Sequence, residues 1–436
     1  MTNSIANSKT FCPLPFIHMA TRPNGDVRLC CTSNASGAGI VDSKEIGLVK
    51  RDGINMNLRQ RTIEEVWNSE YMRNTRIQMR DGVVPDSCKK CFVEESHGIK
   101  SKRYWETEVW KERIDLDSAV NKMSIDGSMP IDIPYFDLRL GNLCNLKCIM
   151  CSPHDSSSWI KDWKIQSPQY KNIILREDQG WDRTMDYTWY QKGSFLESMR
   201  TQAQYIKELY FAGGEPLLIP EHYNILEFMV SEGHAKNCIL RYNSNGTEIN
   251  EKLLELWSHF KLVKFNFSID AYKDKNDYIR YPSKWEEIEK NLHILDNTGD
   301  NIIVNVACAV QALNILYLDE LVDWKMSQNF KKVNRKDYGA GLIGLHLVYL
   351  PSYMNVRVLP YNLKVKATKH IYNLIEKYDS KEFEYDPYGK QRWLGLVKYM
   401  KDEDWSGKLP ALIEYLEITD KTRNTDYRKT FIDLIL

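Results

Sequence analysis

Six short apolar runs recur through the middle of the chain, each about the length of one β-strand. They lie near residues 134–140, 206–212, 238–244, 262–269, 302–309 and 342–349. Segments with helical spacing of apolar residues, such as HYNILEFMVSEG and WEEIEKNLHILDN, separate these runs. Strands that alternate with helices predict an α/β fold with a parallel sheet and crossover helices.

The flanking regions follow other patterns. Residues 12–31 predict a β-hairpin that turns at Pro23-Asn24-Gly25. Residues 62–82 then predict a helix, with Thr62 and Glu65 as a capping box. From these patterns we expect a cysteine-rich α+β domain at 1–99, a linker at 100–131, a barrel-sized α/β domain at 132–360 and a helical region at 361–436.

The segment 152–205 is longer than one crossover helix requires and is rich in aromatic residues. These residues are Trp159, Trp163, Tyr170, Trp181, Tyr187, Trp189 and Tyr190. Such aromatic density argues against disorder. Two interpretations stay open, a lid over the mouth of the domain and simple packing onto it.

Composition excludes several classes of partner. The 436 residues carry 59 basic and 59 acidic side chains, so charge gives no support to nucleic-acid binding. The N-terminal residues do not resemble a signal peptide, and no apolar run is long enough to span a membrane. We therefore expect a cytoplasmic protein. In that compartment we expect its ten cysteines to serve as metal ligands rather than to form disulfides.

The strongest chemical motif is GNLCNLKCIMC at 141–151, directly after the first predicted strand of the α/β domain. It spaces Cys144, Cys148 and Cys151 as C-x3-C-x2-C. Thiolates favour iron–sulfur clusters or zinc over magnesium or calcium. A structural zinc site would take four ligands, whereas three thiols on a 4Fe-4S cluster leave one iron open to a substrate or cofactor.

A second motif, KELYFAGGEPLL, lies at the next predicted strand. The third and fourth predicted strands end in RYNSNGT and FNFSIDA. Together with C-x3-C-x2-C, this succession resembles the radical S-adenosylmethionine (SAM) superfamily over roughly residues 132–360. The resemblance implies a partial (β/α)6 barrel of the TIM type, a 4Fe-4S cluster on the three cysteines, and cleavage of SAM to a 5′-deoxyadenosyl radical. It also implies a reductant such as flavodoxin or ferredoxin.

The resemblance further implies residues that contact SAM at the strand ends. The predicted set is Met150, Gly213, Gly214, Glu215, Pro216, Asn243, Ser268, Asp270 and Arg280. The GGEP segment would receive the methionyl amino group, with glycines allowing close approach of the backbone. Arg280 is open to two interpretations, a bidentate contact with the SAM carboxylate or a surface ion pair.

The N-terminal cysteines form a separate set. Cys12, Gly25 and Cys30 fit the opening pattern C-x(9–15)-G-x4-C of the auxiliary iron–sulfur domain called SPASM, or twitch in its shorter form, and Cys88 and Cys91 follow as C-x2-C. This similarity implies a second 4Fe-4S cluster on these four thiols. A four-cysteine zinc site is the alternative, and Cys31 could replace Cys30.

Taken together, these motifs predict an oxidoreductase-type radical SAM enzyme with an N-terminal auxiliary cluster. Relatives with such domains mostly modify peptides or proteins, so we expect a peptide or protein substrate. Oxidation or rearrangement of a small polar metabolite is the alternative within the same chemistry. A non-catalytic metal-binding scaffold is the alternative of another class.

Overall fold

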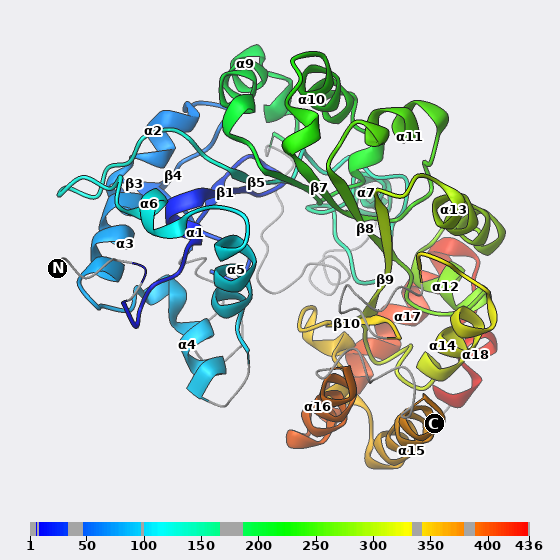
Figure 1. The fold of residues 1–436 in the computed structure, drawn as a ribbon. Helices are drawn as coiled ribbons and strands as arrows, with labels where there is room; N and C mark the ends of the chain where they lie inside the picture. The colour runs from blue at the N-terminus through cyan, green and yellow to red at the C-terminus, as the bar shows by residue number, and fades with distance from the viewer. Residues whose placement is uncertain are drawn as a thin grey trace. The chain divides into compact units, whose positions relative to one another are not determined.

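The fold is built on an eight-stranded, mostly parallel sheet with the strand order β10-β9-β8-β7-β6-β5-β1-β2 (Figure 1). The computed structural model describes residues 6, 8–33, 47–96, 100–165, 186–333, 342–378 and 389–434. The six predicted strands are present as β5 (Tyr135–Leu138), β6 (Glu208–Phe211), β7 (Ile239–Ser244), β8 (Leu262–Ser268), β9 (Ile302–Val310) and β10 (Gly344–Leu347). This confirms the α/β class and is consistent with the expected partial (β/α)6 barrel.

The chain forms two compact units. The first comprises Met1–Asn142, Asp182–Arg241 and His259–Lys261, and the second comprises the remaining residues. These limits differ from the predicted domain boundaries, because the predicted α/β domain contributes to both units. The domain boundaries therefore remain a prediction.

The predicted N-terminal hairpin is present in the first unit. Strand β1 (His18–Thr21) pairs antiparallel with β2 (Val27–Arg28), and β1 also pairs in parallel with β5, with His18 opposite Tyr135. The prediction is wrong at the start of the hairpin, where α1 (Leu14–Ile17) forms a helical turn. Proline suits the first positions of a helix, since its missing N–H would have no partner there.

The predicted helix over 62–82 consists of two helices, α2 (Ile63–Trp67) and α3 (Glu70–Arg80). Thr62 and Glu65 form the predicted capping box, and Ser69 caps α3, which explains the break between the helices. The other longer helices of this unit are α4 (Lys89–Ser96), α5 (Lys102–Lys111), α6 (Leu116–Val120), α9 (Gly193–Gln202) and α10 (Pro220–Ser231). A short hairpin of β3 (Lys50–Arg51) and β4 (Ile54–Asn55) completes it.

In the second unit, β8 pairs in parallel with β9, and β9 with β10. Strand β8 alternates buried Val263, Phe265 and Phe267 with half-buried neighbours, as expected of a strand with one face in the core. Its helices are α7 (Trp159–Ile165), α11 (Glu251–Ser258), α12 (Asp274–Ile279), α13 (Trp285–Asn297), α14 (Leu318–Ser327), α15 (Tyr361–Tyr378), α16 (Gly389–Asp402), α17 (Leu409–Arg423) and α18 (Tyr427–Thr430).

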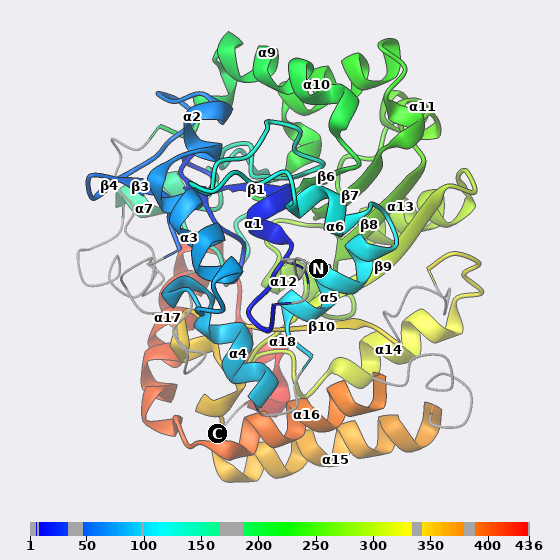
Figure 2. The same ribbon diagram turned by 60° about the vertical axis from the view of Figure 1, so that its left-hand side comes forward.

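The C-terminal region is helical, as predicted. Helices α15 and α16 lie side by side in both views (Figures 1 and 2). Within the described ranges, none of the helices combines the length and the apolar character needed to cross a bilayer.

Candidate functional site

The three motif cysteines of the α/β domain lie on one loop, residues 143–151, which we call the cluster loop. Two of its backbone N–H groups are bonded to carbonyls at the end of α12 and directly after it. Lys147 N–H donates to the Tyr281 carbonyl at 2.7 Å, and Ile149 N–H donates to the Ile279 carbonyl at 2.8 Å. These two bonds fix the middle of the loop, since the amides lie on either side of Cys148.

Side chains around the start of α7 bind carbonyl groups of the cluster loop. Ser158 Oγ donates to the Cys144 carbonyl at 2.7 Å, and Trp159 Nε1 donates to the Cys148 carbonyl at 3.1 Å. Ser156 Oγ donates to the Leu146 carbonyl at 2.5 Å. The polar residues directly after the motif therefore satisfy loop carbonyls that would otherwise be buried without partners.

Helix α17 contributes two further contacts to the same loop. Tyr415 Oη donates to the Ile149 carbonyl at 2.6 Å, and Arg423 Nη2 donates to the Lys147 carbonyl at 2.6 Å. The Arg423 guanidinium also lies over the Trp159 ring, 4.8 Å from its centroid. Sequence reasoning missed both α17 residues, because they lie 266 and 276 positions from their partners.

The thiols of the loop have unequal acidity. The hydrogen bond between Cys148 and Cys151 lowers the pKa of Cys148 in spite of burial, and Arg280 lowers it further. The same hydrogen bond raises the pKa of Cys151. Asn245 Nδ2 lies 3.9 Å from Cys144 Sγ, within reach of a weak hydrogen bond. Three thiols on a fixed loop with a cation beside them form a donor set that fits a 4Fe-4S cluster, whose ligands are thiolates.

Asp270 and Arg280 interact with each other. Asp270 is fully buried, and its Oδ2 lies 2.8 Å from Arg280 Nε. Asp270 Oδ1 accepts a hydrogen bond from Ala309 N–H at 2.7 Å. Both carboxylate oxygens thus have partners inside the protein. The ion pair predicted as one possibility for Arg280 is present, although it is buried and does not lie on the surface.

The predicted GGEP residues belong to the first unit. Gly213 has φ +79°, and a Cβ placed on it would come within 2.9 Å of Arg139 Cβ. Glycine is required here by conformation and by the neighbouring Arg139 side chain. Glu215 is buried, and its Oε1 accepts a hydrogen bond from Leu217 N–H at 3.1 Å. The predicted contacts of Gly213, Gly214, Glu215 and Pro216 with SAM remain predictions.

The other predicted SAM contacts lie in the second unit. Met150 and Ser268 are half-buried, on the cluster loop and at the end of β8. Asn243 is exposed, and its Oδ1 accepts a hydrogen bond from Asn266 at 2.9 Å. No contact of these residues argues for or against a role in SAM binding, so their roles also remain predictions.

The N-terminal cysteines surround one small cavity in the first unit. Its lining includes Cys12, Cys30, Cys88 and Cys91, together with Lys102 and Arg103. Cys31 does not line it, which favours Cys30 as the ligand. In the described part of the chain no three His, Cys, Asp or Glu side chains meet at a point that could hold a single metal ion. Four thiols around a cavity, with two cations beside them, fit the ligand set of a second 4Fe-4S cluster.

Four of the predicted aromatic side chains of the 152–205 segment are packed inside their units, and Tyr187 is half-buried. Trp159, Trp163, Trp189 and Tyr190 are at most 8% exposed. Trp189 Nε1 donates to the Pro23 carbonyl at the turn of the N-terminal hairpin, at 3.0 Å. Of the two interpretations, packing is supported for these residues. Tyr170 and Trp181 lie outside the described residues.

Comparisons with known proteins give relatives of low identity. An uncharacterized protein of Methanocaldococcus jannaschii is 27% identical over 206 residues, which cover 45% of this chain and 60% of that protein. Two solved structures of Streptococcus suis SuiB are 13% identical. The SAM-bound form gives a TM-score of 0.32 over 75% of this chain and 65% of SuiB, and the form bound to precursor peptide SuiA gives 0.34 over 78% and 66%.

Family models match the two cysteine-containing regions separately. Residues 12–92 match the SPASM model, an iron–sulfur cluster-binding domain, and residues 138–324 match the radical SAM superfamily model. The SPASM match contains Cys12, Cys30, Cys88 and Cys91, and the radical SAM match contains the cluster loop. The two domains imply 4Fe-4S clusters and SAM as cofactors. The chain therefore belongs to the radical SAM superfamily and carries an iron–sulfur cluster-binding domain of the SPASM type at its N-terminal end.

Proposed function

We propose that this chain is an oxidoreductase-type radical SAM enzyme that removes a hydrogen atom from a peptide or protein segment. The cluster loop carries the proposal, because its backbone is bonded on several sides while Cys144, Cys148 and Cys151 stay available as ligands. The cysteines outside the two sets are Cys31, Cys238 and Cys308, and the last two are fully buried at strands β7 and β9. No fourth thiol adjoins the loop in sequence.

A 4Fe-4S cluster with one open iron supplies, when bound, the electron that cleaves SAM to methionine and a 5′-deoxyadenosyl radical. The chain's own residues hold the loop, orient SAM and exclude water. We assign the methionyl end of SAM to Gly213, Gly214, Glu215 and Pro216. We assign contacts with the remainder of SAM to Met150, Asn243 and Ser268.

We assign Asp270 and Arg280 a positioning role. Arg280 directly precedes Tyr281, whose carbonyl binds Lys147 of the cluster loop, and Ile279 binds Ile149 from the other side. The buried ion pair to Asp270 holds this segment in place. The two residues therefore act through the loop, whether or not the remaining N–H groups of Arg280 also bind the SAM carboxylate.

The N-terminal cavity is proposed to hold the auxiliary cluster on Cys12, Cys30, Cys88 and Cys91. Four thiols leave no iron open, which favours electron transfer over direct substrate binding. Lys102 and Arg103 line the cavity and offset the negative charge of the thiolates. The peptide substrate is supported by the presence of this auxiliary domain, which peptide-modifying radical SAM enzymes share.

Anaerobic reconstitution tests the two cluster assignments. We expect about eight irons and eight sulfides per chain, about half of which should be lost in a Cys144→Ala, Cys148→Ala, Cys151→Ala variant. This variant should also form no 5′-deoxyadenosine from SAM and dithionite. A variant that kept both clusters would contradict the assignment, and zinc in place of iron at the N-terminal site would overturn only the auxiliary half.

Isotope transfer tests the substrate. Deuterated peptides encoded near the gene should transfer label into 5′-deoxyadenosine. Transfer only from a deuterated sugar, cyclitol or nucleotide would contradict the peptide proposal and support the small-metabolite alternative. Reconstituted protein that holds zinc and cleaves no SAM would support the scaffold alternative.

A further inference from the structure

The cavity of the N-terminal cysteines is lined by three cations as well as by thiols. Lys90, Lys102 and Arg103 all contribute to its lining, and the last two lie in the first turn of α5. An iron–sulfur cluster on four thiolates is an anion, and each electron that it takes up adds a negative charge. Positive charge and hydrogen-bond donors near the sulfur atoms therefore raise the reduction potential of such a cluster.

Arg103 is held by groups other than the thiols. Its Nε donates to Glu95 Oε1 at 2.9 Å, and its Nη2 pairs with the second oxygen of the same carboxylate. Its Nη1 donates to the Phe11 carbonyl at 2.8 Å. Lys90 also has a carboxylate partner, Glu94, at 3.8 Å. The charge of Arg103 is therefore offset by a bidentate partner, and the side chain ties the start of α5 to the segment that leads to the first cysteine.

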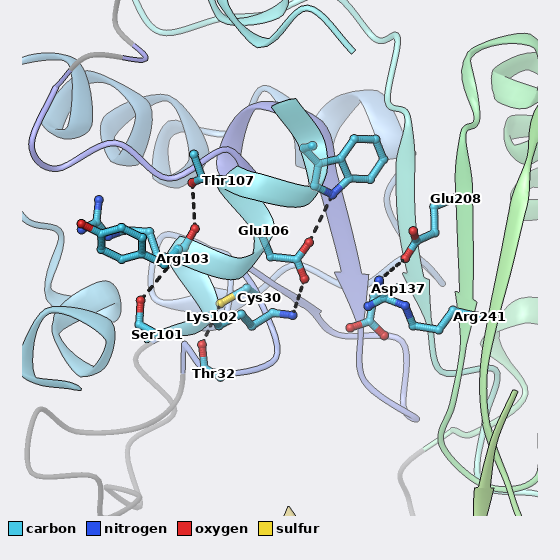
Figure 3. A network of polar contacts seen from close by, with 12 residues as sticks. Cys30, Thr32, Ser101, Lys102, Arg103, Glu106, Thr107, Asp137, Glu208 and Arg241 are labelled. Atoms are coloured by element: carbon cyan, nitrogen blue, oxygen red, sulfur yellow. Dashed lines mark hydrogen bonds and ion pairs between the residues drawn. The ribbon is translucent and has the colours of Figure 1, made fainter. Parts of the chain in front are cut away.

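Lys102 makes fewer contacts than Arg103 (Figure 3). Its Nζ donates one hydrogen bond, to Glu106 Oε1 at 2.8 Å, one turn further along α5. An ammonium group has three N–H donors, and in the part of the chain that the structure describes the other two have no acceptor. The Lys102 side chain is only 22% exposed. A largely shielded ammonium group with spare donors thus lies in the wall of the cavity that also carries Cys30.

Glu106 holds the Lys102 ammonium group in place. The Glu106 side chain is 7% exposed, and its Oε2 accepts a hydrogen bond from Nε1 of the fully buried Trp110 at 3.2 Å. Ser101 caps the first turn of α5, which fixes the start of the helix. Glu106 does not line the cavity itself. Its negative charge therefore acts on the cavity from behind Lys102 and offsets part of the positive charge of that residue.

We propose that Lys102 raises the reduction potential of the auxiliary cluster through its charge and its free N–H donors, and that Glu106 is a positioning residue that limits this effect. The inference rests on the proposed function, in which the auxiliary cluster serves electron transfer, and it identifies the residues that regulate that transfer. Removing the charge of Lys102 and removing the charge of Glu106 should shift the potential in opposite directions. A purely structural role of the pair predicts no such reversal of sign.

The experiment measures the midpoint potential of the auxiliary cluster by redox titration followed by electron paramagnetic resonance. It uses the reconstituted full chain with the three cysteines of the cluster loop replaced by alanine, so that the auxiliary cluster alone gives the signal. In this background, Lys102→Met should lower the equilibrium constant for one-electron reduction about tenfold, which corresponds to about 59 mV. Lys102→Arg keeps the charge and the donors, and its constant should stay within about threefold of the background.

Two further variants test the sign and the location of the effect. Glu106→Gln should raise the equilibrium constant about threefold, a smaller change than that of Lys102→Met because Glu106 lies behind the lining. Lys111→Met is the matched control. It removes the same charge from an exposed position of the same helix, outside the cavity lining, and should leave the potential unchanged.

Three outcomes would overturn the inference. The first is a potential of Lys102→Met equal to that of the background, and the second is an equal shift in Lys111→Met. The third is a shift of Lys102→Met and Glu106→Gln in the same direction, because distortion of the site would then be the cause. If Lys102→Met holds no cluster, Glu106→Gln decides, since a raised potential supports the inference and an unchanged or lowered one overturns it.

Metal analysis of the same samples separates this inference from the proposed function. Zinc at the N-terminal site would overturn the auxiliary-cluster assignment and this inference together. About four irons per chain in the alanine background, with a potential that does not respond to Lys102→Met, would overturn only the inference and leave the auxiliary cluster in place.

Discussion

Replacing Asp270 with asparagine should destabilise the second unit and loosen the cluster loop. In the wild-type chain, Asp270 is fully buried and Arg280 is 12% exposed, so neither charge is solvated by water. An asparagine can still accept the Ala309 N–H, but its neutral amide would remove the carboxylate that pairs with the Arg280 guanidinium. Breaking a buried ion pair from one side costs about 3–5 kcal/mol.

That cost predicts a fall in melting temperature of about 6–20 °C for a unit of this size. The assay is anaerobic thermal unfolding of the reconstituted chain, followed by circular dichroism, with loss of visible cluster absorbance recorded in parallel. Because Arg280 adjoins the residues that bind Lys147 and Ile149, the cluster should be lost faster in the presence of a chelator. The two readouts should change together.

Two controls separate this interpretation from a general effect of removing charge. Asp270→Asn combined with Arg280→Gln should recover part of the stability, since no uncompensated charge remains. Glu417→Gln breaks an exposed ion pair with Arg428 and should change stability by less than about 1 kcal/mol. A melting temperature of Asp270→Asn within about 2 °C of the wild type would refute the positioning role.

Three further predictions concern single contacts. Tyr415→Phe should leave the buried Ile149 carbonyl without its side-chain donor, cost about 1–3 kcal/mol and speed iron loss to a chelator, whereas Tyr361→Phe at an exposed position should not. Burial lowers the pKa of His18 to about 4. In the unfolded chain His18 is protonated below about pH 6.5, whereas in the folded chain it stays neutral until about pH 4. The free energy of unfolding should therefore fall by about 2 kcal/mol from pH 7 to pH 5. His18→Gln should flatten this urea-denaturation profile and exposed His259→Gln should not; equal slopes would contradict the assignment. Gly25→Ala should lower the melting temperature more than Gly53→Ala, because both glycines have positive φ but only a Cβ at Gly25 would meet Trp189, at 2.6 Å; equal losses would exclude this overlap.

The features that the sequence predicted correctly depend on local patterns. Six strands, the N-terminal hairpin and the Thr62 capping box follow from periodicity and turn chemistry within a few residues. The break after α2 had a local signal as well, because Ser69 is a good N-cap residue, but a continuous helical period masked it. The helical turn of α1 was signalled by Pro13 at its N-cap and Pro15 in its first turn.

The missed features depend on contacts between distant segments. Tyr415 sits on an ordinary amphipathic helix, and nothing near it in sequence indicates that its hydroxyl reaches Ile149. The family motif implied roles in SAM binding for Asp270 and Arg280, which stay predictions. It did not indicate that these two side chains pair with each other, because the pairing depends on how α12 returns the chain. Spacing within a motif can identify ligands, but it gives no information on which remote side chains hold those ligands in place.

The position of the auxiliary domain shows how such a remote contact can serve function. The sequence shows that the SPASM-type domain precedes the α/β domain, but this order does not indicate which strand the hairpin of that domain pairs with. In the first unit, β1 pairs in parallel with β5, so the hairpin continues the sheet from the strand that leads toward the cluster loop. An exposed edge of β5 is thereby covered, which removes an aggregation-prone edge. The same backbone pairing fixes Arg28, two residues before the proposed ligand Cys30, in register with Asp137 of β5. The pairing of β1 with β5 therefore sets where the hairpin, and with it the proposed cluster ligand Cys30, lies relative to the strand that precedes the cluster loop in sequence.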